Sequence, residues 1–387
     1  MNALIVHVMQ PVLSVSTSEQ LAHGLQLLAA SDFLALDTEF MRDDTYYPVL
    51  CLIQAADTRH CMVIDPLATN ASGERLDLAP LWHFLSDRSR LKVLHAARQD
   101  LEVLSQAMSR SMQFPDQPIT GPVFDTQVAA GLLGHPAQVG YGQLVTQRLQ
   151  HTLPKGHART DWNKRPLSSE QLDYAADDVR YLVPLYQNLR EALRSAGRQD
   201  WLDQEMQELE DPALYRTEPQ EAWRRLKGLD RLNPAQRATA KLLARWREER
   251  AMQSNRPRGW ILSDEALRDI AERLPTAQSL PRIRNLPPAV IRKRGEELLT
   301  LVAQGKERAA SESTQPQPGR PEPEQLAKVT QLMSVVRAAA QQLNIASELL
   351  ATRRDVERLV FSGRTGRLLN GWRREVIGER LIELTQS

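Results

Sequence analysis

Three strand-like runs follow one another between residues 33 and 65: FLALD, YYPVLCLIQAA and HCMVID. Short polar turns separate these runs, which predicts neighbouring antiparallel strands. The pattern then changes to alternating helix and strand, with LKVLH at residues 91–95 followed by the helical ARQDLEVLSQAM. Antiparallel strands that lead into βα alternation constrain the fold strongly. They predict an α/β domain over residues 1–200, with a mixed sheet flanked by helices.

Beyond this domain the sequence has helical periodicity and no convincing strand pattern. The segment RAASESTQPQPGRPEPEQ is rich in proline, serine and glutamine, which is typical of a linker. We therefore expect one small all-helical domain at residues 215–305, a linker at 306–324, and a second all-helical domain at 325–387.

Several residues predict where individual helices begin or bend. Ser16, with Glu19 three residues later, is expected to cap the first helix. Ser263 or Asp264, and Ser347, are expected to cap helices in the C-terminal part. In the helical run SEQLDYAADDVRYLVPLYQNLREALRSAG, Pro184 is expected to bend the helix.

The charge of the chain is divided unevenly although the net charge is only +1. Residues 1–200 hold 17 Lys and Arg against 22 Asp and Glu, and the remainder holds 32 against 26. An acidic half suits a part that holds cations, and a basic half suits a part that binds a polyanion, although solvated helical faces would give the same balance.

The cellular compartment is predicted from what the sequence lacks. The two cysteines, Cys51 and Cys61, have no C-x-x-C spacing, which argues against a disulfide framework or a zinc cluster. The first residues do not have the pattern of a signal peptide, and no run approaches 18 apolar residues. We expect a cytoplasmic protein with no membrane segment.

Four carboxylates stand out by their context. Asp37 and Glu39 end an apolar strand at alternate positions, so both side chains point to the same face. Asp100 opens a helix, and Asp178 lies on a helix with Tyr174 four residues earlier, on the same face. Carboxylates that converge repel one another unless a cation lies between them, and hard divalent ions such as Mg²⁺ and Mn²⁺ prefer oxygen ligands. Two such ions could clamp the attacking and leaving oxygens of a phosphodiester, and the tyrosine could position the attacking water. Taken singly, these residues would also fit a solvated strand end, a helix start, a helix surface and a core tyrosine.

The segments FLALDTEF, HAARQDLEVL and YAADDVRYL resemble, in this order, the three motifs of the DEDD superfamily of exonucleases. The spacing of Tyr174 and Asp178 matches the subgroup whose third motif is Y-x-x-x-D. TYYPVLCLIQ, FDTQ and RTDWNKRPLS extend the resemblance to the bacterial ribonuclease D family. The two helical blocks resemble the helicase-and-RNase-D C-terminal (HRDC) domains of that family.

This resemblance implies a ribonuclease H-like fold followed by two HRDC domains. It also implies a 3′→5′ exoribonuclease that uses two divalent metal ions, Mg²⁺ or Mn²⁺, and releases nucleoside 5′-monophosphates. By position, Asp37, Glu39, Asp100 and Asp178 would be the metal ligands, Asp37 would bridge the ions, and Tyr174 would hold the water. The implied partners are tRNA precursors and other structured RNAs with single-stranded 3′ ends, and we expect a monomer.

Other residues are candidates for substrate contact. Lys155, His157 and Arg159 lie in a basic loop and could meet phosphates. Phe40 and Tyr46 could stack on a terminal base. Two alternatives stay open at this level: a 3′→5′ DNA exonuclease of the proofreading type, since no motif identifies a contact to the 2′-hydroxyl, and a non-catalytic nucleic-acid-binding protein.

Overall fold

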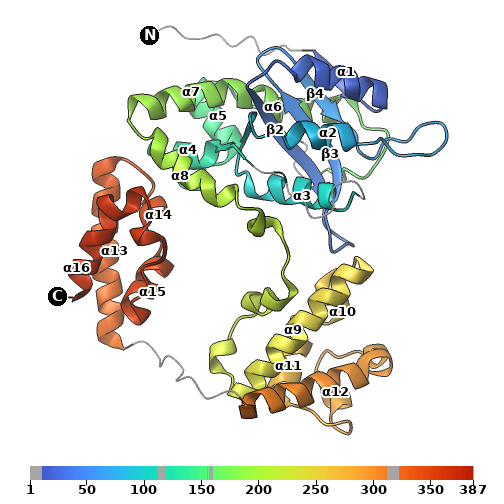
Figure 1. The fold of residues 1–387 in the computed structure, drawn as a ribbon, viewed down its shortest axis with the longest axis vertical. Helices are drawn as coiled ribbons and strands as arrows, with labels where there is room; N and C mark the ends of the chain where they lie inside the picture. The colour runs from blue at the N-terminus through green and yellow to red at the C-terminus, as the bar shows by residue number, and fades with distance from the viewer. Residues whose placement is uncertain are drawn as a thin grey trace. The chain divides into compact units, whose positions relative to one another are not determined.

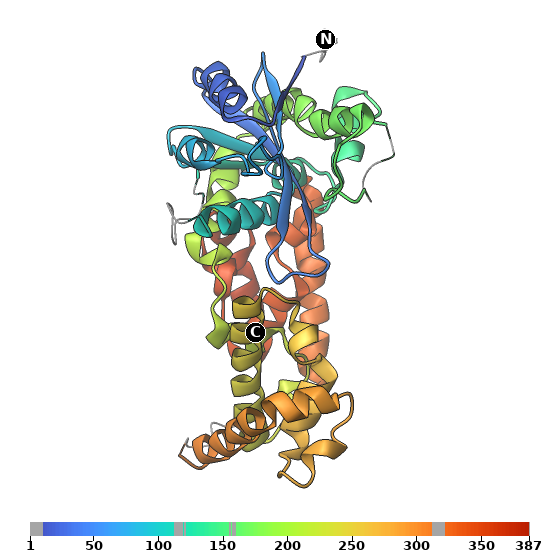
Figure 2. The ribbon, with the colours of Figure 1, turned by 90° about the vertical axis from the view of Figure 1, so that its right-hand side faces the viewer.

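The structure is a computed structural model, and it describes residues 11–111, 119, 121–154, 156, 160–311 and 322–386. The chain divides into two compact units (Figures 1 and 2). The sheet unit comprises Met1–Met41, Leu50–Tyr215 and Arg320–Ser387. The helical unit comprises Arg42–Val49 and Arg216–Gly319. In the described part no helix is long and apolar enough to cross a membrane.

A six-stranded mixed sheet forms the centre of the sheet unit, with strand order β1-β4-β3-β2-β5-β6. Antiparallel pairing joins β3 to β4, whereas β1 pairs in parallel with β4, and β2, β5 and β6 are parallel to one another. The mixed sheet confirms the predicted class. The strands are β1 (Val12–Val15), β2 (Phe33–Met41), β3 (Val49–Ala56), β4 (Cys61–Ile64), β5 (Leu91–Leu94) and β6 (Val123–Asp125).

The sequence pattern did not indicate β1 or β6. Both are edge strands, of 4 and 3 residues, and a run that short carries too few side chains to show a period of two. Tertiary pairing defines them instead, with Val12 opposite Cys61 and Lys92 opposite Val123.

Helices cover both faces of this sheet (Figure 1). On one face α6 and α7 pack against β2, and the ring of Phe33 on β2 lies 4.8 Å from the ring of Tyr186 on α7. α3 packs against the other face of β2, where Thr38 contacts it. The helices of this part are α1 (Ser18–Leu28), α2 (Ala79–Leu85), α3 (Arg98–Ser109), α4 (Thr126–Gly131), α5 (Tyr141–Leu149), α6 (Ser169–Arg180), α7 (Leu182–Ser195), α8 (Gln199–Leu209) and the short η1 (Pro212–Tyr215).

Pro184 has a larger effect than the predicted bend. The helical run separates into α6, which ends at Arg180, and α7, which begins at Leu182. A proline ring cannot donate to the carbonyl four residues earlier and clashes with it, and here that carbonyl belongs to Arg180. The break therefore ends the helix that carries Asp178 shortly after that residue.

Two predicted N-caps are corrected and one is confirmed. Thr17 rather than Ser16 caps α1, because Gln20 closes a capping box with Thr17. Ser263 caps α11 by accepting from the Ala266 N–H at 3.1 Å. Ser347 is the first residue of α14 and not its N-cap.

The helical unit has its own apolar core, built mainly from α9, α11 and α12. α9 and α12 approach closely because Gly305 has no side chain, and a Cβ there would lie 2.8 Å from the backbone of Thr239. α12 continues to Ser311, into the range predicted as linker. The elements are η2 (Pro219–Arg225), η3 (Leu229–Arg231), α9 (Pro234–Ser254), α10 (Arg258–Ile261), α11 (Asp264–Arg273), η4 (Leu280–Arg282) and α12 (Pro288–Ser311).

The second helical block belongs to the sheet unit, and α8 provides its docking surface. Arg373 pairs with Glu205 of α8, with 2.6 Å between Nη2 and Oε2, and Trp372 stacks on Trp201 with 4.4 Å between ring centroids. The Ala346 N–H also donates to the Gly131 carbonyl at 2.9 Å. The elements are α13 (Pro323–Leu343), α14 (Ser347–Leu350), α15 (Arg353–Ser362), η5 (Gly366–Leu369), the π-helical turn η6 (Arg374–Gly378) and α16 (Glu379–Gln386).

Candidate active site

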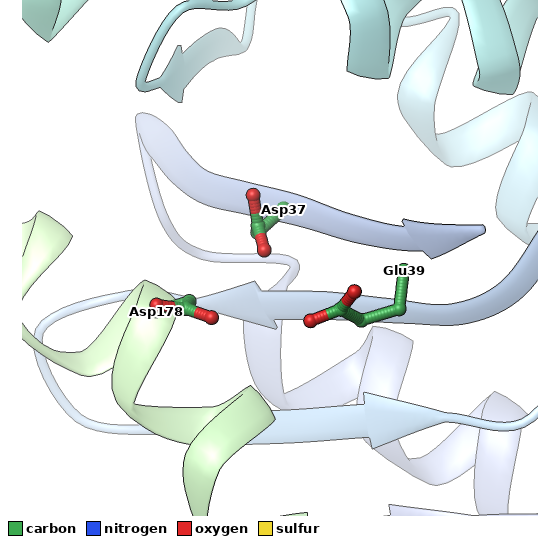
Figure 3. A group of neighbouring side chains, drawn as sticks. All are labelled: Asp37, Glu39 and Asp178. Carbon is green, nitrogen blue, oxygen red and sulfur yellow. The ribbon is translucent and has the colours of Figure 1, made fainter. Parts of the chain in front are cut away.

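Three carboxylates meet where β2 faces α6. Asp37 and Glu39 alternate along β2 and so share the face against which α6 packs. Ser168 and Gln171 form a capping box that starts α6, and the helix then brings Asp178 to the same place. One carboxylate oxygen from each of Asp37, Glu39 and Asp178 lies within 4.8 Å of the others. Figure 3 shows the three side chains together, two from β2 and one from α6.

Asp100 lies beside this triplet but its carboxylate is turned to a different partner. The hydroxyl of Thr38, the residue between Asp37 and Glu39, donates to Oδ1 of Asp100 at 2.6 Å. Asp100 is 8% exposed and lies in the first turn of α3. The structure thus brings three of the four predicted carboxylates into one group and holds the fourth next to it through Thr38, a residue that the sequence analysis did not single out.

A buried aspartate positions the start of α3. Asp125 accepts hydrogen bonds from the backbone N–H groups of Ala96 at 3.0 Å and Ala97 at 2.9 Å. Ala96 has φ of 54°, a left-handed conformation that costs a non-glycine residue free energy and that these two bonds offset. Asp125 also caps α4 through the Gln127 N–H at 2.8 Å. The strand-to-helix sequence FDTQ contained the signal for this cap, but not for the contact to α3.

His95 is fully hydrogen-bonded within the protein. Its Nδ1 lies 2.9 Å from the hydroxyl of Thr126, and its Nε2 lies 3.0 Å from the carbonyl of Val139. Burial lowers its pKa, which favours the neutral ring. A histidine with both nitrogens engaged has a structural role here, as a link between α3, α4 and the turn before α5.

The carboxylates hold protons more tightly than isolated acids do. Removal from water, and then the charges of the neighbouring acids, raise the pKa of Asp37 well above its ordinary value. The same causes raise the pKa of Glu39 to about 8 and that of Asp178 to about 7. Burial raises the pKa of Asp100 to about 6, although the Thr38 hydroxyl acts in the opposite direction.

These shifts mean that a bare, fully ionised cluster is unfavourable, and a divalent cation removes this cost by supplying the opposite charge. The donor set consists of carboxylate oxygens, with no thiolate or imidazole in the triplet, and this set fits a hard cation. This acidic group is therefore suited to divalent metal ions.

Tyr174 lies one turn before Asp178 on α6, beside a cleft. Burial, followed by the charges of Asp178 and Glu39, raises the pKa of Tyr174 above its ordinary value of 10.0. The phenol therefore stays protonated near neutral pH, where it can donate or accept a hydrogen bond but cannot serve as a strong base. The cleft has a volume of about 1180 Å³, and its walls come from α5, residues 152–154, Gly156 and α6.

The candidates for substrate contact fall into three groups. Lys155, His157 and Arg159 lie outside the described residues. Phe40 is half-buried on β2, next to Glu39. Tyr46 belongs to the helical unit, where its hydroxyl donates to Glu248.

Comparisons with known proteins identify the family of the two parts of the chain. A family model described as 3′-5′ exonuclease matches residues 12–194, and a model of the HRDC domain matches residues 236–302. The second helical block lies outside both matches, so its assignment as an HRDC domain stays a prediction.

The similarity to known proteins covers nearly the whole chain. Ribonuclease D of Acidiphilium cryptum is 39% identical over 382 residues, which cover 97% of this chain and 93% of that protein. Ribonuclease D of Sphingobium indicum is 37% identical over 381 residues, covering 96% and 94%. The crystal structure of Escherichia coli RNase D, described as an exoribonuclease involved in structured RNA processing, superposes with a TM-score of 0.82 at 31% identity, covering 97% of this chain and 99% of that one. This protein is a 3′→5′ exoribonuclease, and it belongs to the ribonuclease D family.

Proposed function

We propose that Asp37, Glu39, Asp100 and Asp178 hold two divalent metal ions, Mg²⁺ or Mn²⁺, and that Asp37 contacts both. The observation that carries this proposal is the convergence of three carboxylates with raised pKa values, with Asp100 adjacent. When bound, such ions supply charge stabilisation to the attacking and leaving oxygens of a phosphodiester. The Thr38 hydroxyl bonds to Oδ1 of Asp100 alone, so this carboxylate can keep that contact while it joins the other ligands.

The remaining residues of the site position the reactants. Tyr174, protonated at neutral pH, orients the attacking water by a hydrogen bond and does not remove its proton. Thr38 and Asp125 keep Asp100 and the start of α3 in place. The products are nucleoside 5′-monophosphates, released one at a time from the 3′ end.

The substrates that we propose are RNAs with a structured body and a single-stranded 3′ end, among them tRNA precursors. The HRDC match at residues 236–302 and the description of the E. coli relative support this class. Lys155, His157 and Arg159 remain candidates for contacts to phosphates. Phe40 remains a candidate for stacking, and we further propose a cytoplasmic monomer.

A single experiment tests the reaction and its site. RNA labelled at its 5′ end is incubated with the protein and Mg²⁺ or Mn²⁺, next to a DNA oligomer of the same sequence. A descending ladder on RNA that disappears with EDTA and in the Asp37→Asn variant is expected. A ladder that persists in Asp37→Asn would reject the proposed site, and equal degradation of DNA would reject the proposed preference for RNA.

A further inference from the structure

One tryptophan differs from the others in its exposure. Of the seven in the chain, Trp260 is 58% exposed, and in the described part it and Leu326 are the large apolar side chains that lie exposed. Trp201 stacks on another ring, and Trp223 lies under Lys241 with 4.8 Å between Nζ and the ring centroid. The remaining four, each at most 8% exposed, are Trp82, Trp162, Trp246 and Trp372.

The backbone that presents Trp260 is held firmly. Trp260 lies on the single turn α10, two residues after Arg258. The guanidinium of Arg258 binds the carboxylate of Glu248 through two contacts of 2.6 Å and 2.7 Å, and Glu248 has a side chain that is 1% exposed. A bidentate pair to a buried carboxylate fixes the turn, so the indole is presented without a large loss of conformational entropy on binding.

The same ion pair holds a segment that is continuous with the catalytic strand. The hydroxyl of Tyr46 donates to Glu248, and the guanidinium of Arg258 lies 4.8 Å from the centroid of the Tyr46 ring. Tyr46 lies in the segment 42–49, which follows directly after β2 in the chain. The turn that carries Trp260 is therefore anchored to the segment that leaves the strand with Asp37 and Glu39.

The surroundings of Trp260 suit a nucleotide rather than an apolar partner. Gly259 has open space where a Cβ would be, so a ribose or phosphate can approach the backbone. The Arg256 side chain is exposed, and within the described residues its guanidinium has no ion-pair partner. An exposed indole with an exposed arginine four residues earlier in the chain suits single-stranded nucleic acid, which is bound by stacking of a base together with contact to a phosphate.

We propose that Trp260 is a stacking platform for a base of the single-stranded part of the RNA, with Arg256 at a neighbouring phosphate. This inference rests on the proposed function, since it takes RNA as the substrate. Stacking on an aromatic ring tolerates any base, so the platform adds affinity without sequence preference.

The test measures RNA binding without cleavage. A fluorescently labelled single-stranded RNA is titrated in EDTA with the wild-type protein and with Trp260→Ala, Trp260→Phe and Leu326→Ala. Trp260→Ala is expected to bind about tenfold more weakly, because an alanine at a stacking position costs roughly 1–3 kcal/mol per base. Trp260→Phe is expected to retain most of the affinity, and Leu326→Ala, the matched loss of an exposed apolar side chain, is expected to bind like the wild type.

Two further readouts separate stacking from a structural effect. RNA is expected to quench the tryptophan fluorescence of the wild type more than that of Trp260→Ala. Arg256→Ala is expected to lower the slope of log Kd against log salt by about 0.7, the loss of one phosphate contact to a single strand. Thermal melting of each variant is the control that the helical unit stays folded.

The outcomes separate this proposal from the function on which it rests. Equal RNA affinity of Trp260→Ala and the wild type would overturn the platform. Sedimentation of both proteins without RNA gives a second check: a wild type that dimerises and a Trp260→Ala variant that does not would show the indole to be a contact between two copies of the chain, and would also overturn the platform. In both cases the wild-type ladder on RNA remains, so the exoribonuclease is unaffected. Absence of that ladder in the wild type would instead contradict the proposed function.

Discussion

The substitution Glu39→Gln is expected to abolish activity and at the same time to stabilise the metal-free protein. The carboxylate of Glu39 has a pKa raised from 4.5 to about 8, first by burial and then by the charges of Asp178 and Asp100. Ionising it at neutral pH therefore costs the folded state free energy. Glutamine has nearly the same shape and carries no charge, so it removes this cost together with the metal ligand.

The sign and size of the effect follow from the raised pKa. An acid whose pKa is higher in the folded state contributes its full stability below about pH 4.5, and loses it as pH rises towards 8. At pH 7, which is 2.5 units above 4.5, the loss reaches at most about 3.5 kcal/mol, at roughly 1.4 kcal/mol per pKa unit. Because Glu39 is partly accessible to solvent, screening reduces the expected gain in Glu39→Gln to about 1–2 kcal/mol.

The assay is thermal melting in EDTA at pH 5 and pH 8. The melting temperature of Glu39→Gln is expected to be close to that of the wild type at pH 5, and about 3–6 °C higher at pH 8. Glu19→Gln serves as a control, since Glu19 is exposed and hydrogen bonds lower its pKa, so this change should not stabilise the protein. A difference that does not grow with pH, or a lower melting temperature for Glu39→Gln, would refute the argument.

Three other substitutions test the surroundings of the carboxylates and the docking of the second helical block. Asp125→Ala leaves two backbone N–H groups without their acceptor, and is expected to cost about 2–3 kcal/mol of stability and to slow the reaction, as measured by melting and by the rate on RNA. Glu205→Ala removes the partner of Arg373, and is expected to loosen the second helical block by about 3 kcal/mol, seen as faster hydrogen exchange in residues 322–386; unchanged exchange would contradict it. Tyr174→Phe is expected to lower kcat about 10- to 100-fold with little change in KM, because positioning of the water acts on the chemical step; an unchanged kcat would remove Tyr174 from the mechanism.

The C-terminal part illustrates how far sequence patterns reach. Composition and periodicity predicted helices there, and this is confirmed for the described residues. They did not predict that the last helical block joins the sheet unit through Arg373 and Trp372. From the sequence alone, Arg373 would be assigned to a solvated helix face or to a contact with phosphate. Its partner, Glu205, cannot be identified because it is far away in the sequence.

The sequence by itself determined the strands β2 to β5, the helical character of the rest, and the family, through the order and spacing of its acidic motifs. These features depend on residues within a few positions of one another, where periodicity, caps and prolines act. Only the tertiary structure decided that Thr38 holds Asp100, that Asp125 holds the turn before α3, and that Trp260 is the exposed indole. Each of these depends on which distant segments pack together, and a local sequence pattern does not specify which distant residues it will contact.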